Sequence, residues 1–489
     1  MGKGSKKNKA PEAKIEVPKA ASANLVWQGI ADEKLNYRAT ASHVDVRADD
    51  DKLLGKMFNM AFVALSDGKP DPARPVTFAF NGGPGCASVP IDFGGIGPKR
   101  VRPNGLGHIP AGAPLEDNPY SILAKTDLVF LDALGTGWSK VAPGVEDSKV
   151  FGIDADADCF ARAICAWLQD NGRWASPVYL FGESYGTVRN AALMRLLGER
   201  SVKLTGVVML SAIFDWVQTQ PGADSYYLGM MPTYAATAQH FGRAGAGVDV
   251  DTWFDQAMDF TEDVLAPALL KGDRLSAQTE REVAEQLAAF IGIPVEHILA
   301  KHLRVDLTDF RATLLADEGK ACGRLDTRFV SDAPSYVQTS NQWLAAEDAA
   351  DDAVDGVWVS AFRAFCSDVL GYEGPARYLS SNYWKIGPAW QWKHTMQGAE
   401  EDAQAPNMAL DIAIAMRRDP TLKLAIIGGR YDAATTWWNV AHDMSCQYLS
   451  DELKARVRWY RYGCGHMAYV DEETNRAMGT DMRAFYDMV

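Results

Sequence analysis

The chain has 489 residues, of which 47% are hydrophobic and 23% are charged, as expected for a globular protein of roughly two to four domains. Its net charge of −14 argues against nucleic acid or an anionic membrane surface as a partner, because binding to either begins with the neutralisation of phosphates. The chain also lacks a run of about 18 apolar residues, so we expect no membrane span.

The N-terminal residues are rich in Lys, Ala and Pro and lack the apolar stretch of a secretory signal. We therefore expect a disordered basic tail over residues 1–26. The seven cysteines are odd in number and widely scattered along the chain. In the absence of a signal, this pattern predicts reduced thiols in a cytoplasmic protein.

The first half of the chain predicts a sheet that begins antiparallel and becomes parallel. Residues 35–66 are rich in β-forming side chains and contain a turn at Asp-Asp-Asp, residues 49–51, so we expect an antiparallel meander there. Apolar strands follow at residues 76–80, 127–132, 177–181 and 206–214, and amphipathic helices at residues 154–171 and 187–200. This alternation indicates a mostly parallel sheet with helices on both faces.

The alternation of strands and helices stops near residue 217. The sequence is then acidic and helix-periodic, without a convincing strand, until about residue 385. A helix at residues 408–417 and strands at residues 422–428 and 457–462 resume the earlier pattern. We therefore expect one sheet built from two core segments, residues 27–215 and 386–489, around a helical cap insertion over residues 216–385.

The sequence Gly-Glu-Ser-Tyr-Gly at residues 182–186 lies between a predicted strand and a predicted helix. This is the context of a nucleophile elbow, a sharp turn that holds a serine over the positive end of a helix. Both flanking positions are glycine because so tight a turn has no room for side chains. Ser184 is therefore the candidate nucleophile, and the alternative is an ordinary strand-to-helix turn.

A serine hydroxyl becomes a nucleophile when a base removes its proton and a carboxylate orients that base. Asp432 and His466 each follow a predicted strand, so both are expected at the carboxyl edge of the sheet. The order Ser, Asp, His is that of an α/β-hydrolase. Asp443 competes with Asp432 for the role of the carboxylate.

Most other histidines lie in helix-like sequence, where a surface or capping role is expected: His240, His297, His302, His394 and His442. No second Cys/His pair and no His-Glu-x-x-His motif accompany Cys464 and His466. We therefore expect neither a metal nor another cofactor at this site.

An acyl transfer site also needs N–H donors that stabilise the oxyanion. In an α/β-hydrolase they come from the residue after the nucleophile, here Tyr185, and from an earlier loop. The turn Asn-Gly-Gly-Pro-Gly at residues 81–85 directly follows an early apolar strand. Gly83, or its neighbour Gly82, is therefore the expected second donor.

Taken together, these motifs resemble the serine carboxypeptidase family in their order and spacing. The matching segments are residues 81–86, 127–139 and 182–186, the Asp432 loop and Gly-His-Met at residues 465–467. Gly-Arg-Leu-Asp at residues 323–326 and Met-Pro-Thr-Tyr-Ala at residues 231–235 are similar to its bacterial branch. The resemblance covers about residues 35–489 and implies an exopeptidase that removes the last residue of a peptide.

The resemblance also implies how the substrate is held. In the family, the Asn of the Gly-rich turn and the Glu before the nucleophile bind the terminal carboxylate, which assigns this role to Asn81 and Glu183, with Gly82 beside them. Glu183 can hold a carboxylate only by donating a proton, which requires a raised pKa and favours acidic pH. Met467 corresponds to a pocket residue beside the leaving group; the alternative is a filler of the core.

Two positions need comparison with the family pattern. Many members carry a second Glu where this chain has Gly95, so half of a carboxyl pair is missing, and Gly95→Glu is expected to improve recognition of free carboxylates if the side chain fits. In many secreted members the Cys of the Gly-rich loop is bonded to the cap. Here Cys86 has Cys322 and Cys366 as candidate partners, but the missing signal argues against a disulfide.

The first hypothesis is a serine carboxypeptidase that forms an acyl-enzyme on Ser184, with a peptide that has a free C-terminus as its substrate. An esterase or acyltransferase with the same triad is the alternative, because Gly95 weakens the expected grip on the carboxylate. A catalytically silent binding protein of the same fold is disfavoured by the intact candidate triad. The oligomeric state stays open.

Overall fold

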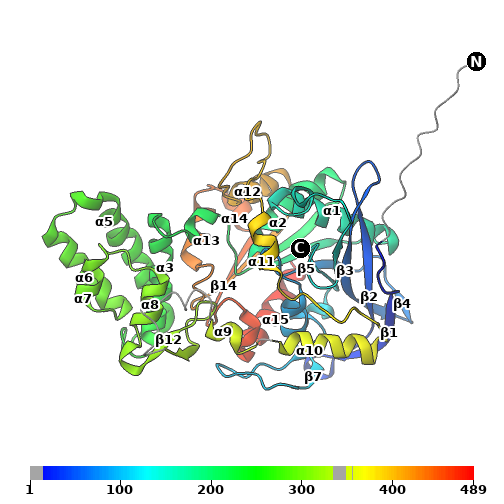
Figure 1. The fold of residues 1–489 in the computed structure, drawn as a ribbon, viewed down its shortest axis with the longest axis horizontal. Coiled ribbons are helices and arrows are strands. Elements are labelled where there is room, and N and C mark those ends of the chain that lie inside the picture. Colours follow the sequence, from blue (N-terminus) through cyan, green and yellow to red (C-terminus); the bar gives the residue numbers. More distant parts are fainter. Residues whose placement is uncertain (1–14, 334–347, 355, 489) are drawn as a thin grey trace, which may run out of the picture.

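A mixed sheet of 11 strands organises the protein, in the computed structural model that describes residues 15–333, 348–354 and 356–488 (Figure 1). Its order is β1-β2-β3-β8-β5-β10-β11-β14-β15, and β4 and β9 pair with β3. The strands are β1 (Ala21–Gln28), β2 (Lys34–Arg47), β3 (Leu53–Ser66), β4 (Lys69–Pro70), β5 (Val76–Phe80), β8 (Asp127–Leu131), β9 (Lys140–Val141), β10 (Val178–Glu183), β11 (Leu204–Leu210), β14 (Lys423–Gly429) and β15 (Val457–Tyr462). A separate hairpin joins β6 (Lys99–Val101) and β7 (Leu115–Asp117).

Strands β1, β2, β3 and β8 pair antiparallel, and every pair from β8 to β15 is parallel. The predicted mixed sheet, mostly parallel with an antiparallel entry, is therefore confirmed. The predicted strands and helices of the core are present with small shifts at their ends.

The boundary predicted for the N-terminal tail is wrong, because β1 begins at Ala21 and pairs with β2. Trp27 anchors this strand: its side chain is buried, and its indole N–H donates to the carbonyl oxygen of Asn118 at 2.7 Å. The Lys-, Ala- and Pro-rich composition of the N-terminal residues gave no indication of this strand. The buried side chain of Trp27 attaches it to the core. Residues 1–14 lie outside the described residues.

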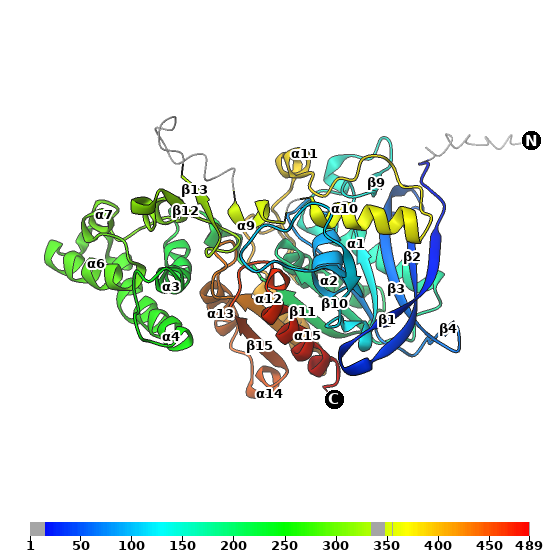
Figure 2. The same ribbon diagram turned by 90° about the horizontal axis from the view of Figure 1, so that it is seen from below.

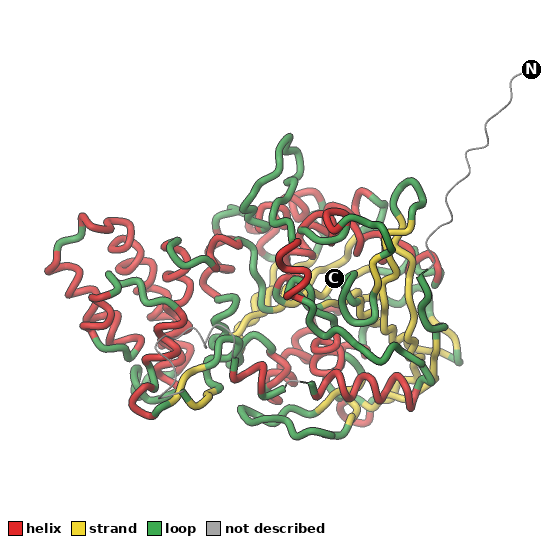
Figure 3. Tube along the Cα trace, in the orientation of Figure 1, coloured by secondary structure: helices red, strands yellow, loops and turns green. Residues whose placement is uncertain are grey.

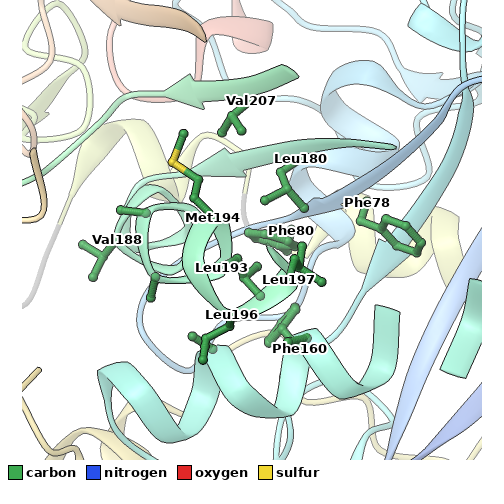
Figure 4. Close-up of a cluster of buried hydrophobic side chains, with 14 of the residues drawn as sticks. Phe78, Phe80, Phe160, Leu180, Val188, Leu193, Met194, Leu196, Leu197 and Val207 are labelled. Atoms are coloured by element: carbon green, nitrogen blue, oxygen red, sulfur yellow. The ribbon is translucent and has the colours of Figure 1, made fainter. Parts of the chain in front are cut away.

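Successive residues of the central strands face opposite sides of the sheet, as a pleated strand requires. Phe78 and Phe80 belong to the core on one face, and Ala79 between them belongs to the core on the other. Helices α1 (Ile153–Asp170) and α2 (Tyr185–Glu199) cover the first face, where Leu193 and Leu197 of α2 lie against the sheet (Figure 4). Helices α12 (Ala409–Arg418) and α13 (Trp437–Ser445) pack on the same face, and α15 (Glu472–Tyr486) packs on the opposite one.

The predicted cap insertion consists of two parts with different partners. Residues 224–313 form a helical lobe at one end of the molecule, with a hydrophobic core of its own (Figures 1 and 3). Its helices are α3 (Asp224–His240), α4 (Val250–Phe260), α5 (Ala266–Lys271), α6 (Ala277–Ile291), α7 (Val295–Ala300) and α8 (Leu307–Thr313). This part agrees with the expected helical cap.

The second part of the insertion packs on the second face of the sheet, opposite α1 and α2, rather than against the lobe (Figure 2). Helix α10 (Val357–Ala364) carries Trp358 and Phe362 into the core of the second sheet face. The remaining short helices are α9 (Ala349–Asp352), α11 (Tyr383–Ile386) and, near the C-terminus, α14 (Asp451–Lys454). Amphipathic periodicity predicted helix here but carries no information on which surface the apolar side contacts.

Two strands, β12 (Lys320–Cys322) and β13 (Val330–Asp332), form a hairpin inside the insertion, which corrects the expectation that no strand interrupts it. They are too short to show a period of two in the sequence. Residues 334–347 and 355, which fall within the predicted cap insertion, lie outside the described residues. Within the described ranges, no helix combines the length and apolarity needed to cross a bilayer.

Candidate active site

Ser184 occupies a strained turn between β10 and α2. Its φ of 59° and ψ of −128° lie in a region that residues with side chains rarely adopt and that is typical of functional turns. The Ser184 N–H donates to the carbonyl of Leu210 at 2.9 Å, and the Thr187 N–H and hydroxyl both donate to the Ser184 carbonyl at 2.8 Å. A Cβ at Gly182 would lie 2.3 Å from the carbonyl oxygen of Gly186. The turn therefore has the geometry expected of a nucleophile elbow.

His466 and Asp432 form a buried pair at the ends of neighbouring parallel strands, β15 and β14. His466 Nδ1 lies 2.8 Å from Asp432 Oδ2, and the two residues are 5% and 0% exposed. Burial disfavours the imidazolium, but the charge and hydrogen bond of Asp432 outweigh burial and raise the pKa of His466. The N–H groups of Ala434 and Thr435 donate to Asp432 Oδ1 at 2.8 and 2.9 Å and hold the carboxylate in place.

The competing carboxylate, Asp443, contacts other groups. Its Oδ1 accepts hydrogen bonds from the side-chain amides of Gln218 at 2.8 Å and Asn407 at 3.0 Å. Burial raises the pKa of Asp443 to about 7. The structure thus places Asp432, rather than Asp443, beside His466.

Nucleophile and base line one cavity of about 470 Å³. The predicted site residues on its wall are Asn81, Gly82, Gly83, Glu183, Ser184, His466 and Met467. Asp432 lies behind His466, and the side chain of Tyr185 is fully buried, so that only its backbone is a candidate for contact with substrate. Met467 is half-buried: it lines the cavity and also packs against the core of the second sheet face. Its two predicted roles, pocket residue and core filler, are therefore compatible in this structure.

The Gly-rich turn after β5 lies directly against the elbow. A Cβ at Gly82 would lie 2.4 Å from the backbone nitrogen of Tyr185, so only glycine permits this approach. Gly83 has a φ of 107° and lines the cavity beside Ser184. The oxyanion role of Gly83 and Tyr185 stays a prediction. The structure supports it in one respect, because the Gly-rich turn and the backbone of Tyr185 lie side by side.

Glu183 is a buried carboxyl group next to the nucleophile, and it accepts hydrogen bonds from the hydroxyl of Tyr469, whose oxygen lies 2.9 Å from Oε2 and 3.1 Å from Oε1. Burial raises the pKa of Glu183 to about 7, although the positive charge of His466 and hydrogen bonds from Tyr469 and Asn81 oppose the shift. The side-chain oxygen of Asn81 accepts the N–H of Ile91 at 2.9 Å, which orients its amide. A carboxyl with this pKa is protonated in weakly acidic solution and can then donate a hydrogen bond.

The condition set for Gly95→Glu is that the new side chain fits. A Cβ at Gly95 would lie 3.0 Å from Cδ1 of Tyr469 and 3.4 Å from two further atoms of the ring, so the ring has to shift by a few tenths of an ångström to admit it. The prediction that this substitution improves carboxylate recognition therefore depends on a movement of the Tyr469 ring.

Sequence reasoning missed several buried polar residues, of which Arg189 and Tyr469 contact residues of the site. Arg189 of α2 is fully buried, pairs with Asp156 at 2.6 Å and donates to the carbonyl of Asn81 at 2.9 Å. Tyr469 gave no signal other than its place three residues after His466. His394, expected on a helix surface, is fully buried outside any helix, with Asp154 at 2.5 Å and Asp411 at 3.2 Å.

The loop between β12 and β13 holds the histidine loop in place. The Leu325 carbonyl accepts the His466 N–H at 2.6 Å, and Asp326 Oδ2 accepts the Gly465 N–H at 2.9 Å. Asp326 is also paired with Arg328 at 2.6 Å. The Gly-Arg-Leu-Asp motif that carried part of the resemblance thus contacts the loop of the predicted base.

All seven cysteines are free thiols, including Cys86, Cys322 and Cys366. The disulfide considered for Cys86 is therefore not formed. Cys86 lines the cavity, and burial raises the pKa of its thiol to about 11. The cytoplasmic location stays a prediction.

Comparisons with known proteins agree with this geometry. The serine carboxypeptidase family matches residues 30–233, which include the Gly-rich turn and the elbow but neither Asp432 nor His466. The chain is 31% identical over 119 residues to Serine carboxypeptidase-like 36 of Arabidopsis thaliana, covering 24% of this chain and 23% of that protein. It is 30% identical over 138 residues to Carboxypeptidase Y homolog A of Sclerotinia sclerotiorum, covering 28% and 22%. The matches thus span less than a quarter of either relative.

A likeness to a solved structure extends over nearly the whole chain. Kex1(delta)p, a prohormone-processing carboxypeptidase from Saccharomyces cerevisiae, matches 92% of this chain and 91% of its own with a TM-score of 0.52. At 14% sequence identity this likeness shows the fold alone. The chain has an α/β-hydrolase fold, and its residues 30–233 are similar to the serine carboxypeptidase family.

Proposed function

We propose that the protein is a serine carboxypeptidase that hydrolyses the last peptide bond of a peptide with a free C-terminus. The observation that carries this proposal is the buried, protonatable Glu183 beside Ser184 in the same cavity. A hydrolase of neutral esters has no need of such a group. A peptidase that binds a terminal carboxylate needs a hydrogen-bond donor at this place.

In the proposed reaction, Ser184 Oγ attacks the carbonyl carbon of the last peptide bond while His466 Nε2 takes the hydroxyl proton. Asp432 keeps His466 oriented and stabilises the imidazolium through the contact at 2.8 Å. The N–H groups of Tyr185 and Gly83 stabilise the oxyanion. His466 then gives its proton to the leaving amine, and the C-terminal residue departs. A water that His466 deprotonates hydrolyses the acyl-enzyme and restores Ser184.

Substrate recognition and base catalysis place opposite demands on pH. Glu183 donates to the substrate carboxylate only while protonated, so recognition weakens as the pH rises through its pKa of about 7. His466 acts as a base only while neutral, and its pKa is raised. The proposed enzyme therefore has a bell-shaped pH profile for free-acid peptides, with its alkaline limb due to Glu183.

The test compares three substrates with one acyl group: an N-blocked dipeptide, its C-terminal amide and the corresponding ester, from about pH 4 to about pH 9. Cleavage of the free acid in preference to the amide, lost in Ser184→Ala and declining above about pH 7, is the expected result. Equal cleavage of acid and amide, or turnover of the ester alone, would instead assign the triad to an esterase or acyltransferase.

A further inference from the structure

Tyr469 lies behind the cavity, where its hydroxyl contacts Glu183. We propose that Tyr469 is a positioning residue that holds Glu183 for recognition of a terminal carboxylate and sets the pH range of that recognition. This inference rests on the proposed function and deepens it. The described residues that line the cavity include Glu183 but not Tyr469, so Tyr469 acts through Glu183 rather than on the substrate.

The contact between the two side chains is buried and specific. The hydroxyl oxygen of Tyr469 lies 2.9 Å from Oε2 and 3.1 Å from Oε1 of Glu183, and the residues are 1% and 3% exposed. Glu183 ends β10, one residue before the nucleophile, and Tyr469 comes three residues after the base. The loop that supplies the base therefore also supplies the group that orients the recognition carboxyl.

The ring of Tyr469 is held by two surfaces. Trp358 of α10 contacts it edge-to-face, with ring centroids 5.7 Å apart and planes at 63°. The backbone of Gly95 lies beside the ring, because a Cβ added to Gly95 would lie 3.0 Å from Cδ1 of Tyr469. The neighbouring Gly94 approaches Trp358 in the same way, with 2.8 Å between an added Cβ and Cε2. Two adjacent glycines thus make room for both aromatic rings.

The phenol supplies a donor that does not titrate with the carboxyl group. Burial and the charge of Glu183 raise the pKa of Tyr469 well above its usual value, so its hydroxyl keeps its proton throughout the working range. When Glu183 is ionised, it accepts this proton in a hydrogen bond. When Glu183 is protonated, the hydroxyl keeps one carboxyl oxygen in place, and the other can donate into the cavity. The protonation state of Glu183 therefore determines whether the site can donate a hydrogen bond to a substrate carboxylate.

The direction of the pH effect follows from the groups around Glu183. His466, Tyr469 and the Asn81 amide favour its ionised form, whereas burial and Asp432 favour the protonated form. Asp351 also contributes a negative charge near Tyr469. Removal of the Tyr469 hydroxyl therefore keeps Glu183 protonated to higher pH. It also leaves the Asn81 amide as the remaining hydrogen-bond partner of the carboxyl among the described residues, so the carboxyl is less firmly oriented and binds a substrate carboxylate more weakly.

The experiment measures binding in a Ser184→Ala background, so that it does not depend on turnover. Isothermal titration calorimetry gives Kd for an N-blocked dipeptide and for its amide across the pH range, with and without Tyr469→Phe. We expect the single variant to bind the acid more tightly than the amide below about pH 7. Tyr469→Phe should reduce this preference by about tenfold, the effect of one hydrogen bond to a charged group, and move its pH midpoint upward.

Tyr486→Phe in the same background is the matched control, because its buried hydroxyl contacts Thr77 Oγ1 at 2.7 Å rather than Glu183. This control should leave both the preference and the midpoint unchanged. A Tyr469→Phe protein with a normal thermal transition, an unchanged acid preference and an unchanged midpoint would overturn the proposal.

Failure of this inference and failure of the proposed function give different results. Acid-selective binding that depends on Tyr469, without hydrolysis by the unmodified protein, would retain the inference and reject the carboxypeptidase. Hydrolysis of peptides with equal binding of acid and amide would retain a peptidase and reject the role of Tyr469.

Discussion

The proposed catalytic half of the site (Ser184, Asp432 and His466) and its proposed recognition half (Asn81, Glu183 and Tyr469) are built in different ways. Each catalytic residue follows a parallel strand, β10, β14 or β15, so the sheet brings the three together at one edge. Glu183 needs in addition the ring of Tyr469, which depends on contacts with Gly95 and Trp358. Catalysis thus relies on strand ends, and recognition relies on packing between distant segments.

Because of this difference, we expect that the two halves can be altered separately, although Glu183 and Ser184 are neighbours in the chain. A change at the strand ends should slow all substrates alike. A change behind Glu183 should act on free acids and spare esters with the same acyl group. The four substitutions below test this separation.

Ser184→Ala should have the largest effect. We expect kcat for the free-acid dipeptide and for the ester to fall by about 10⁴-fold or more, because the nucleophile is lost, while the Kd of the dipeptide stays within about twofold. Steady-state kinetics and calorimetry measure the two quantities. Ester turnover that survives in a folded variant would show that another group is the nucleophile.

Glu183→Gln should alter recognition without altering the triad. For the unmodified protein, kcat/KM for the free acid should fall by about tenfold per pH unit above about pH 7, because Glu183 loses its proton. A Gln amide donates at every pH, so this alkaline limb should vanish for the acid. For the ester, only the acidic limb should change: it moves to lower pH, because the charge of Glu183 no longer raises the pKa of His466. An alkaline limb retained in the variant would assign the titration to another group.

Asp326→Asn should slow catalysis and spare recognition. The carboxylate accepts the Gly465 N–H at 2.9 Å, so its loss should displace the His466 loop and lower kcat for acid and ester alike by about tenfold. Asp332→Asn on β13 is the control, because among the described residues its side chain forms an exposed ion pair with Lys320 and no hydrogen bond or ion pair with the His466 loop. A change in the acid-to-amide ratio would show that the two halves are coupled through this loop.

Gly95→Ala should have the smallest effect on activity. The added methyl group meets the Tyr469 ring at 3.0 Å, so we expect a loss of about 1–3 kcal/mol in the free energy of unfolding and a few-fold lower acid-to-amide ratio. Ester hydrolysis should not change. Gly198→Ala serves as the control, because within the described residues no atom outside the neighbouring backbone of its own helix lies within 4 Å of its added Cβ. Equal ratios in the two variants would argue against the packing of Tyr469 as the determinant.

Much of the catalytic half could be predicted because its signals are local. The elbow at residues 182–186 combines two glycines, a preceding strand and a following helix within about twenty residues. The choice between Asp432 and Asp443 could not be settled in the same way, since both are aspartates between β14 and β15. Their partners differ in space: His466 for Asp432, and Gln218 with Asn407 for Asp443.

The strands and helices of the core in their order along the chain, the elbow and the Gly-rich turn could all be predicted from the sequence, because each depends on side-chain periodicity or on glycine within a short segment. Three features are visible only in the folded chain: α10 packs on the second face of the sheet, His394 is buried, and the Tyr469 hydroxyl contacts Glu183. Tyr469 and Glu183 lie 286 residues apart in the chain. Such contacts follow from how distant segments pack together, and no local pattern of side chains records that packing.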